Sequence, residues 1–300
     1  MNFLPHLCVL FNALVWGLAW LPMNLLQENG LSVIWTTFFS YLLLTALLLS
    51  FSPRIFFSFF SSKTLLIMSL AYGLTNICFN WAVTNGDVVR VVFMFYLMPI
   101  WSAIFAKIFL SEKLGFKKIF RIFIAFIGLA IVLEIHKHFL GSGKVDLYEY
   151  LALLGGVFFA LANVFLRKAE SFSSFERSFS IFFGSCLIPF FALLIMFILS
   201  FFDLFSNPIY QLNSFYSINS TFVFTTIILL AVSLGSANFC LQYGGSKISV
   251  QTTSLLMLIE IPVATISSAI FFNKLSDTNV MVGGFLIVFV AVWSSFDKEA

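Results

Sequence analysis

A single carboxylate lies in the middle of a long apolar stretch of this chain. Glu260 is near the centre of 247–272, where a charged group is costly in hydrocarbon unless it is paired, solvated or protonated. An uninterrupted helix would bring Thr253 and Ser267 onto the same face, and Pro262 would free a backbone carbonyl and kink that helix. The carboxylate could therefore bind a proton or a polar solute, or it could be a structural group that joins helices.

Four amide side chains recur at matched spacing in two other apolar stretches. Asn76 and Asn80 are one helical turn apart, and Asn238 and Gln242 repeat that spacing about 162 residues later. An amide offers a donor and an acceptor without a charge, which suits a polar or zwitterionic solute. It also suits hydrogen bonds between membrane helices, which contribute roughly 0.6–2 kcal/mol each. Because both stretches place the amides alike, we predict that all four line one cavity.

Aromatic side chains accompany these polar groups. Asn12, Trp16, Trp20 and Asn24 follow one another at four-residue steps, so a helix would carry them on one face. Such rings could stack on a solute or a cation, or they could form an interfacial belt; for Trp16 we predict the cavity. The full set of predicted solute-binding residues is Glu260, Asn76, Asn80, Asn238, Gln242, Trp16, Asn163 and Tyr243.

Residue patterns for other kinds of chemistry do not occur in the sequence. A membrane enzyme needs paired acids, a serine with a base, or clustered metal ligands, and no such set accompanies Glu260. The four cysteines, Cys8, Cys78, Cys186 and Cys240, lie in apolar stretches without metal-ligand spacing. Neither a phosphate-binding loop nor a basic, aromatic-rich patch for nucleic acid is found. We therefore predict no enzymatic activity, no metal or cofactor, and no nucleic-acid partner.

The elements that must position these residues are membrane-spanning helices. Of the 300 residues, 61% are hydrophobic and only 10% are charged, whereas soluble chains carry roughly 25% charged residues. A membrane span needs roughly 20 mainly apolar residues. We therefore predict an all-α integral membrane protein in contact with the lipid bilayer. Its ten predicted spans are 4–26, 31–51, 64–86, 89–109, 118–135, 148–167, 178–202, 222–243, 247–272 and 278–296.

Basic residues are distributed unequally between the predicted loops. With the amino terminus inside, twelve of the 16 Lys and Arg residues lie on the cytoplasmic side and four lie outside. Positive charge in short loops marks the cytoplasmic side of a membrane protein. We therefore predict a protein of a bacterial-type inner membrane with both termini in the cytoplasm. Termini on the same side of the membrane also require an even number of spans.

The chain contains an internal repeat. The pattern G-x-x-N-x-C occurs at Gly73–Cys78 and again, about 162 residues later, at Gly235–Cys240, and each copy is followed by an apolar helix with a central proline, Pro99 or Pro262. Five spans per copy is an odd number, so the second copy would be inverted relative to the first, as in many secondary transporters. Chance similarity between apolar helices is the alternative. The predicted repeats are 1–138, with helices 1–5, and 147–297, with helices 6–10.

Several short motifs carry a family resemblance. They are Trp16-Gly17 with Trp20 in the first span, Ser111-Glu112-Lys113-Leu114 after the fourth, and Leu258-Ile259-Glu260-Ile261-Pro262 in the ninth. In this order, and with the ten-span duplication, the chain resembles the drug/metabolite transporter superfamily, and within it the ten-helix transporters with two EamA-type domains. The second copy departs from the family pattern, because Asn273-Lys274-Leu275 replaces the usual Gly-Glu ending.

This resemblance implies a central cavity lined by predicted helices 1, 3, 4, 6, 8 and 9, with helices 5 and 10 at the periphery, often as a dimer contact. It implies a secondary active transporter of a small metabolite, expected here to export an amino acid or an organic cation by alternating access. Uptake or exchange, such as import of S-adenosylmethionine, is the alternative, and a polytopic membrane enzyme is a weaker one. The expected partners are a small-molecule solute, the bilayer and protons, for a monomer or homodimer.

Overall fold

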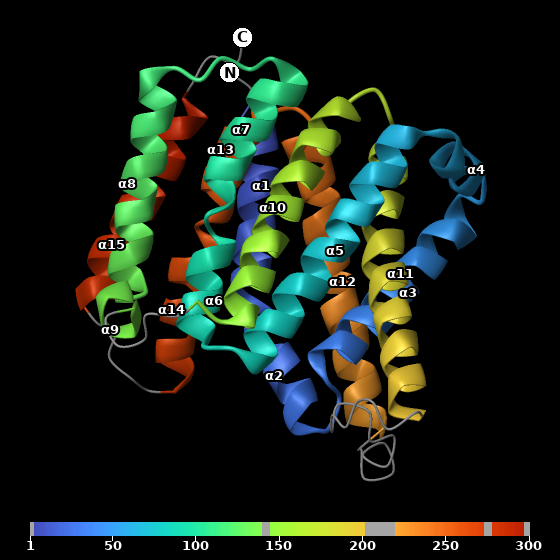
Figure 1. Ribbon diagram of the computed structural model, residues 1–300. Coiled ribbons are helices and arrows are strands. Elements are labelled where there is room, and N and C mark those ends of the chain that lie inside the picture. The colour runs from blue at the N-terminus through green and yellow to red at the C-terminus, as the bar shows by residue number, and fades with distance from the viewer. Residues whose placement is uncertain (1–2, 140–144, 202–219, 273–277, 297–300) are drawn as a thin grey trace.

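The computed structural model describes residues 3–139, 145–201, 220–272 and 278–296, and every regular element in these residues is an α-helix. The helices run side by side in a bundle, and α1 begins at the same end at which α15 stops (Figure 1). The all-helical membrane fold predicted from the sequence is confirmed. Asn273-Lys274-Leu275 lies outside the described residues.

Nine stretches of the described chain are long and apolar enough to cross a membrane. They consist of α1 (Leu4–Leu18) with α2 (Trp20–Glu28), α3 (Val33–Phe51), α5 (Lys63–Asn85), α6 (Val88–Phe95) with α7 (Met98–Leu110), α10 (Leu147–Lys168), α11 (Ser174–Phe201), α12 (Ser220–Gly245), α13 (Val250–Met257) with α14 (Glu260–Phe271), and α15 (Thr278–Ser295).

The remaining predicted span, 118–135, corresponds to the shorter helix α8, Phe116–Val132. Its 17 residues rise about 26 Å, a little less than the roughly 30 Å of a hydrocarbon core. Nine rather than ten helices therefore meet the length expected of a span among the described residues. In Figure 1, α8 runs from the end where α1 begins toward the opposite end, beside α15.

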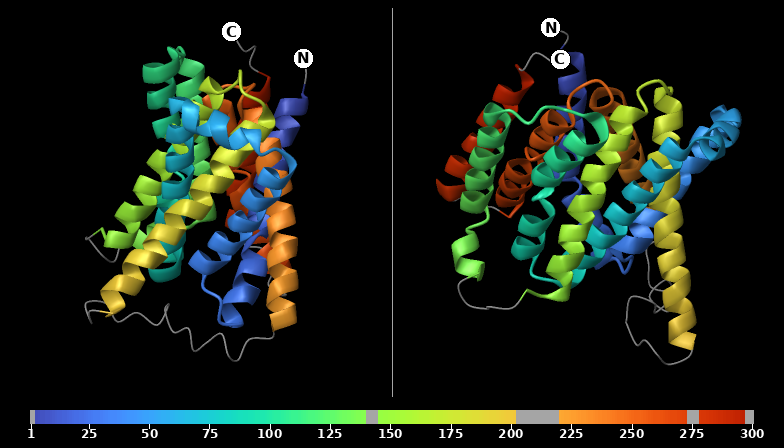
Figure 2. Two further views of the ribbon diagram at one scale, coloured as in Figure 1. Left: turned by 90° about the vertical axis from the view of Figure 1, so that its right-hand side faces the viewer. Right: turned by 45° about the horizontal axis from the view of Figure 1, so that its top comes forward.

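Two short helices were not anticipated from the sequence. Arg54–Ser61 forms α4 and Ile135–Phe139 forms α9. Helix α4 buries Ile55 and Phe59 and exposes Phe57 and Phe60, so one of its faces is buried and the other is exposed. Figure 2 shows that it lies at the side of the bundle remote from α8 and α15.

Besides the first span, whose helix is interrupted at Ala19, two described spans are interrupted near their middle. One stops at Phe95 and resumes at Met98, and the other stops at Met257 and resumes at Glu260, again about 162 residues later. A proline follows each break closely, Pro99 in one span and Pro262 in the other. Proline has no N–H and its ring crowds the carbonyl four residues earlier. At the kink predicted near Pro262, α13 ends at Met257 and α14 begins at Glu260, while Leu258 and Ile259 between them keep helical dihedral angles.

The two spans that are interrupted near their middle have their short halves at opposite ends of the bundle. Helices α6 and α13 have 8 residues each. In Figure 1, α13 lies at the end where α1 begins, whereas α6 lies toward the other end. Inverted copies of one unit would be arranged in this way. The repeat boundaries themselves stay a prediction.

Glycines allow two pairs of helices to approach closely. A β-carbon on Gly184 of α11 would overlap the backbone of Ser69 on α5 and lie 2.7 Å from its Oγ, and one on Gly73 would meet the carbonyl of Gly184. Gly128 of α8 and Gly283 of α15 oppose each other in the same manner. Small residues at such crossings let the backbones make van der Waals contact, which is a main source of stability between membrane helices.

We expect Gly184→Leu to destabilise the fold, because the side chain must separate α5 from α11. Overpacking of this kind typically lowers the free energy of unfolding by about 1–3 kcal/mol. The measurement is the melting temperature of the purified protein in detergent. Gly115→Ala is the matched control, because Gly115 has an ordinary φ of -79° and open space around its β-carbon position. Equal melting temperatures for Gly184→Leu and the parent would contradict the packing argument.

Candidate functional site

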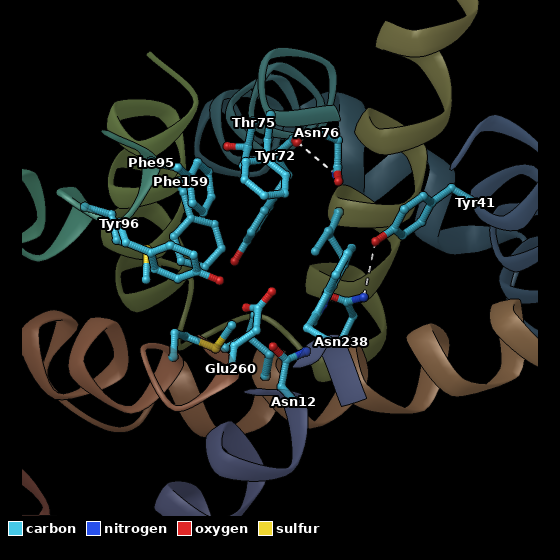
Figure 3. A pocket seen from close by; sticks show the side chains of 16 residues that line it. Asn12, Tyr41, Tyr72, Thr75, Asn76, Phe95, Tyr96, Phe159, Asn238 and Glu260 are labelled. Carbon is cyan, nitrogen blue, oxygen red and sulfur yellow. Dashed lines mark hydrogen bonds between the residues drawn. The ribbon is translucent and has the colours of Figure 1, made fainter. Parts of the chain in front are cut away.

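A cavity of about 60 Å³ lies within the bundle. At roughly 15 Å³ per water molecule it holds a few waters. Its wall takes residues from α1, α3, α5, α6, α7, α10, α11, α12, α13 and α14 (Figure 3). The residues that line it are Asn12, Trp16, Tyr41, Tyr72, Thr75, Asn76, Phe79, Phe95, Tyr96, Met98, Phe159, Ile181, Asn238, Leu241, Met257 and Glu260.

The helix breaks that precede Pro99 and Pro262 meet at this cavity. Glu260 is the first residue of α14, so its carboxyl group lies at a helix amino terminus, where the helix dipole favours a negative charge. Tyr96 lies in the break between α6 and α7, and its hydroxyl group and the Glu260 carboxyl group point into the same cavity (Figure 3). The interruption of each span therefore contributes one polar group to the wall.

Helix α1 packs closely against the Glu260 break. A β-carbon on Gly17 would lie 2.8 Å from the Glu260 carbonyl oxygen, so a larger residue would force α1 away from α14. This approach brings Asn12 and Trp16, which lie one turn apart on α1, to the cavity wall. Figure 3 shows the Asn12 amide beside the Glu260 side chain.

The Asn12 amide is an unusual feature of the wall. The side chain is fully buried, and among the described residues neither Nδ2 nor Oδ1 has a hydrogen-bond partner. An unsatisfied buried polar group costs about 1–3 kcal/mol. Asn12 therefore has both a donor and an acceptor to offer to whatever enters the cavity.

Two of the predicted amides, Asn76 and Asn238, also lie on the wall. The Asn76 Nδ2 donates to the Tyr72 carbonyl oxygen at 3.1 Å and to the Ser185 Oγ at 2.7 Å. The Asn238 Nδ2 donates to the Leu234 carbonyl oxygen at 2.8 Å and to the Tyr41 hydroxyl at 3.3 Å. Both amides therefore stabilise the wall through the hydrogen bonds that their NH₂ groups donate.

Three other predicted residues lie behind the wall rather than on it. The Asn80 Nδ2 donates to the Thr37 Oγ1 at 2.8 Å, which joins α5 to α3. The Gln242 Nε2 donates to the Tyr72 hydroxyl at 3.4 Å, and that hydroxyl donates to the Asn163 Oδ1 at 3.5 Å. Gln242 and Asn163 therefore hold the side chain of Tyr72, which lines the cavity.

The last predicted residue, Tyr243, lies away from the cavity. Its ring is 4.1 Å from the Nζ of Lys247, in a cation–π contact just beyond the end of α12. Thr253 and Ser267, which were expected to share a face with Glu260, do not line the cavity. Ser267 instead accepts a hydrogen bond from the Trp20 Nε1 at 3.0 Å.

Three tyrosines of the wall were missed by the sequence analysis. Tyr72 is one turn before Asn76, and Tyr96 is three residues before Pro99, so both have a local signal that points to the site. Tyr41 lies on α3, a helix that no motif marks. Its place became visible only through its hydrogen bond with Asn238. In the described part of the chain, no three His, Cys, Asp or Glu residues are grouped so as to hold a metal ion.

Comparisons with protein families, curated sequences and solved structures show what this chain is similar to. Residues 4–134 match the EamA-like transporter family. A comparison with curated protein sequences found no match. A solved crystal structure is similar over 96% of this chain and 95% of its own, with a TM-score of 0.69 and 13% sequence identity; this likeness shows the fold alone. The resemblance of this multi-pass membrane protein to the EamA-like transporter family, within the drug/metabolite transporter superfamily, is confirmed.

Proposed function

We propose that the protein is a secondary active transporter that moves an amino acid or an organic cation through the central cavity. The observation that carries the proposal is the meeting of two interrupted spans at Glu260 and Tyr96. Interrupted helices near the membrane midplane are typical of solute sites in transporters. The fully buried, unpartnered amide of Asn12 beside Glu260 adds polar groups that a solute could satisfy.

Alternating access would result from rocking of the two repeats, 1–138 and 147–297, about the cavity. The wall draws on both repeats, since Asn12, Asn76 and Tyr96 belong to the first and Asn238 and Glu260 to the second. A relative rotation would therefore open one end of the cavity while closing the other. The carboxyl group of Glu260 would bind either a proton or the solute, which couples export to the proton gradient.

The end of the bundle where α1 begins is proposed to face the cytoplasm of a bacterial cell. Lys63 at the start of α5, Lys117 near the start of α8, and Arg167 and Lys168 at the end of α10 all lie at this end. Positive charge near short loops is retained on the cytoplasmic side. Export is the proposed direction, and uptake or exchange through the same cavity is the alternative.

The test is a counterflow screen of radiolabelled amino acids and organic cations in liposomes that contain the purified protein. For a solute that is exchanged, we expect Glu260→Gln to lower the exchange rate at least about tenfold and to abolish its dependence on pH, because the cavity loses its carboxyl group. Exchange is measured between pH 6 and pH 8.5.

Glu28→Gln is the matched control for this experiment. Glu28 is exposed at the end of α2, where its carboxylate accepts a hydrogen bond from Asn24, so its exchange rate should equal that of the parent. If Glu260→Gln exchanges solute as fast as the parent at every pH, the role of Glu260 is refuted. If no solute in the screen is exchanged by the parent, the proposal of transport fails.

A second expectation concerns Asn12. Asn12→Leu removes two polar groups that have no partner in the described chain and keeps the number of side-chain heavy atoms, so we expect the free energy of unfolding to rise by about 1–3 kcal/mol. The same variant should exchange solute more slowly, because the solute loses hydrogen bonds. Melting temperature and counterflow are measured on the same preparation. A variant that melts earlier, or one that exchanges at the parent's rate, would show that Asn12 has a structural role instead.

A further inference from the structure

In the described chain, the cavity wall carries one acidic side chain and no basic one. Of the residues that line it, all of them within the described chain, Glu260 alone carries an ionisable acid or base group of the Asp, Glu, Lys, Arg or His type. The nearest guanidinium, Arg177, lies behind Tyr72 and donates to the carbonyl oxygens of Gln242, Ala169 and Phe172. A solute with a carboxylate would thus find no cationic partner on the wall.

Two of the three amides on the wall, Asn76 and Asn238, present only acceptors to the cavity, whereas Asn12 offers both a donor and an acceptor. An NH₂ group has two N–H donors, and both are used in Asn76 and in Asn238. One partner of each is a backbone carbonyl oxygen, which can only accept, so the orientation of each amide is fixed. Within the described chain no donor reaches their Oδ1 atoms, which are left for a solute. These oxygens suit a solute with N–H donors and do not suit a carboxylate.

Aromatic rings form the part of the wall opposite the carboxyl group. The rings of Phe95 and Tyr96 are 5.2 Å apart, those of Phe95 and Phe159 are 6.1 Å apart, and those of Phe159 and Tyr72 are 6.4 Å apart. Figure 3 shows the hydroxyl groups of Tyr72 and Tyr96 and the carboxyl group of Glu260 pointing into the same space. Ring faces attract cations, most strongly where water is excluded.

From these three features we propose that the cavity selects an organic monocation, a protonated amine on an apolar body, and discriminates against amino acid zwitterions and carboxylates. The ammonium group pairs with Glu260 and donates to the amide oxygens, and the apolar body packs against the rings. A zwitterion would bring a carboxylate into a cavity that has little to pair with it, and burial of an unpaired charge is costly. This inference rests on the proposed function, since it concerns the same cavity.

Three compounds that share one skeleton test the selectivity. Phenethylamine is phenylalanine without its carboxylate, and 3-phenylpropanoate is phenylalanine without its amine. We measure their binding to the purified protein in detergent at pH 7.5 by isothermal titration calorimetry. The expected order is amine, then zwitterion, then anion, with the amine at least about tenfold tighter than phenylalanine. The same three compounds built on the smaller leucine skeleton (isoamylamine, leucine and 4-methylpentanoate) control for size.

Glu260→Gln should weaken binding of the amines at least about tenfold and bring the amine and the amino acid to within about threefold of each other, since the ion pair is lost. Glu28→Gln should leave every affinity unchanged. The inference is overturned if an amino acid or a carboxylate binds the parent as tightly as the matching amine, or if none of the six compounds binds.

Counterflow with the same compounds separates this inference from the proposed function. Exchange of phenylalanine or leucine, with no preference for the amines, would uphold transport and refute the selectivity for cations. Tight binding of the amines without any exchange would uphold the selectivity and refute transport.

Discussion

A carboxyl group in the interior of a membrane protein needs polar surroundings, because hydrocarbon offers it none. The organisation of this bundle around Glu260 meets that need. The break before Glu260 exposes the amino terminus of α14 to the carboxyl group, and the break in the other interrupted span supplies the hydroxyl of Tyr96. Gly17 lets α1 approach closely enough to place Asn12 beside it.

The need to surround the Glu260 carboxyl group with polar groups also explains why some helices line the cavity and others face the lipid. Around the cavity, several tyrosines and amides bond to one another and to backbone carbonyls, while the Asn12 amide has no partner in the described chain. Toward the lipid, the surface consists of phenylalanines and aliphatic residues, such as Phe57, Phe116 and Phe285. Helices α8 and α15 contribute nothing to the wall and pair with each other through Gly128 and Gly283. The mobile and the supporting parts of a transporter could be separated in this way.

Much of this fold could be predicted from local properties of the sequence. Hydropathy alone located the spans, because a helix in lipid must be apolar over roughly 20 residues. Pro99 and Pro262 marked the interrupted spans, because proline removes a hydrogen bond wherever it occurs in a helix. Trp16, Asn76, Asn238 and Glu260, which the sequence marks as polar or amphipathic residues in apolar helices, lie together on one cavity wall.

The rest depended on contacts between distant segments. Asn80 and Gln242 have the same spacing as the amides on the wall, but which side of a helix faces a cavity is decided by its neighbours. Thr253 and Ser267 were assigned to the face of Glu260 from helical spacing alone, but neither lines the cavity. Tyr41 had no local signal at all, because it is defined by a partner 197 residues away.

The central claim, that two halves rock about this cavity, is tested most directly by distances between spin labels at both ends of α5 and α12. In a variant without the four native cysteines, one pair of labels replaces Lys63 and Lys247, and the other pair replaces Asn85 and Thr221; all four residues are exposed. Double electron–electron resonance is recorded in lipid nanodiscs at pH 6 and pH 8.5, with and without an exchanged solute. The account predicts that one distance lengthens while the other shortens. Distances that both stay constant, or that both change in the same direction, would contradict it.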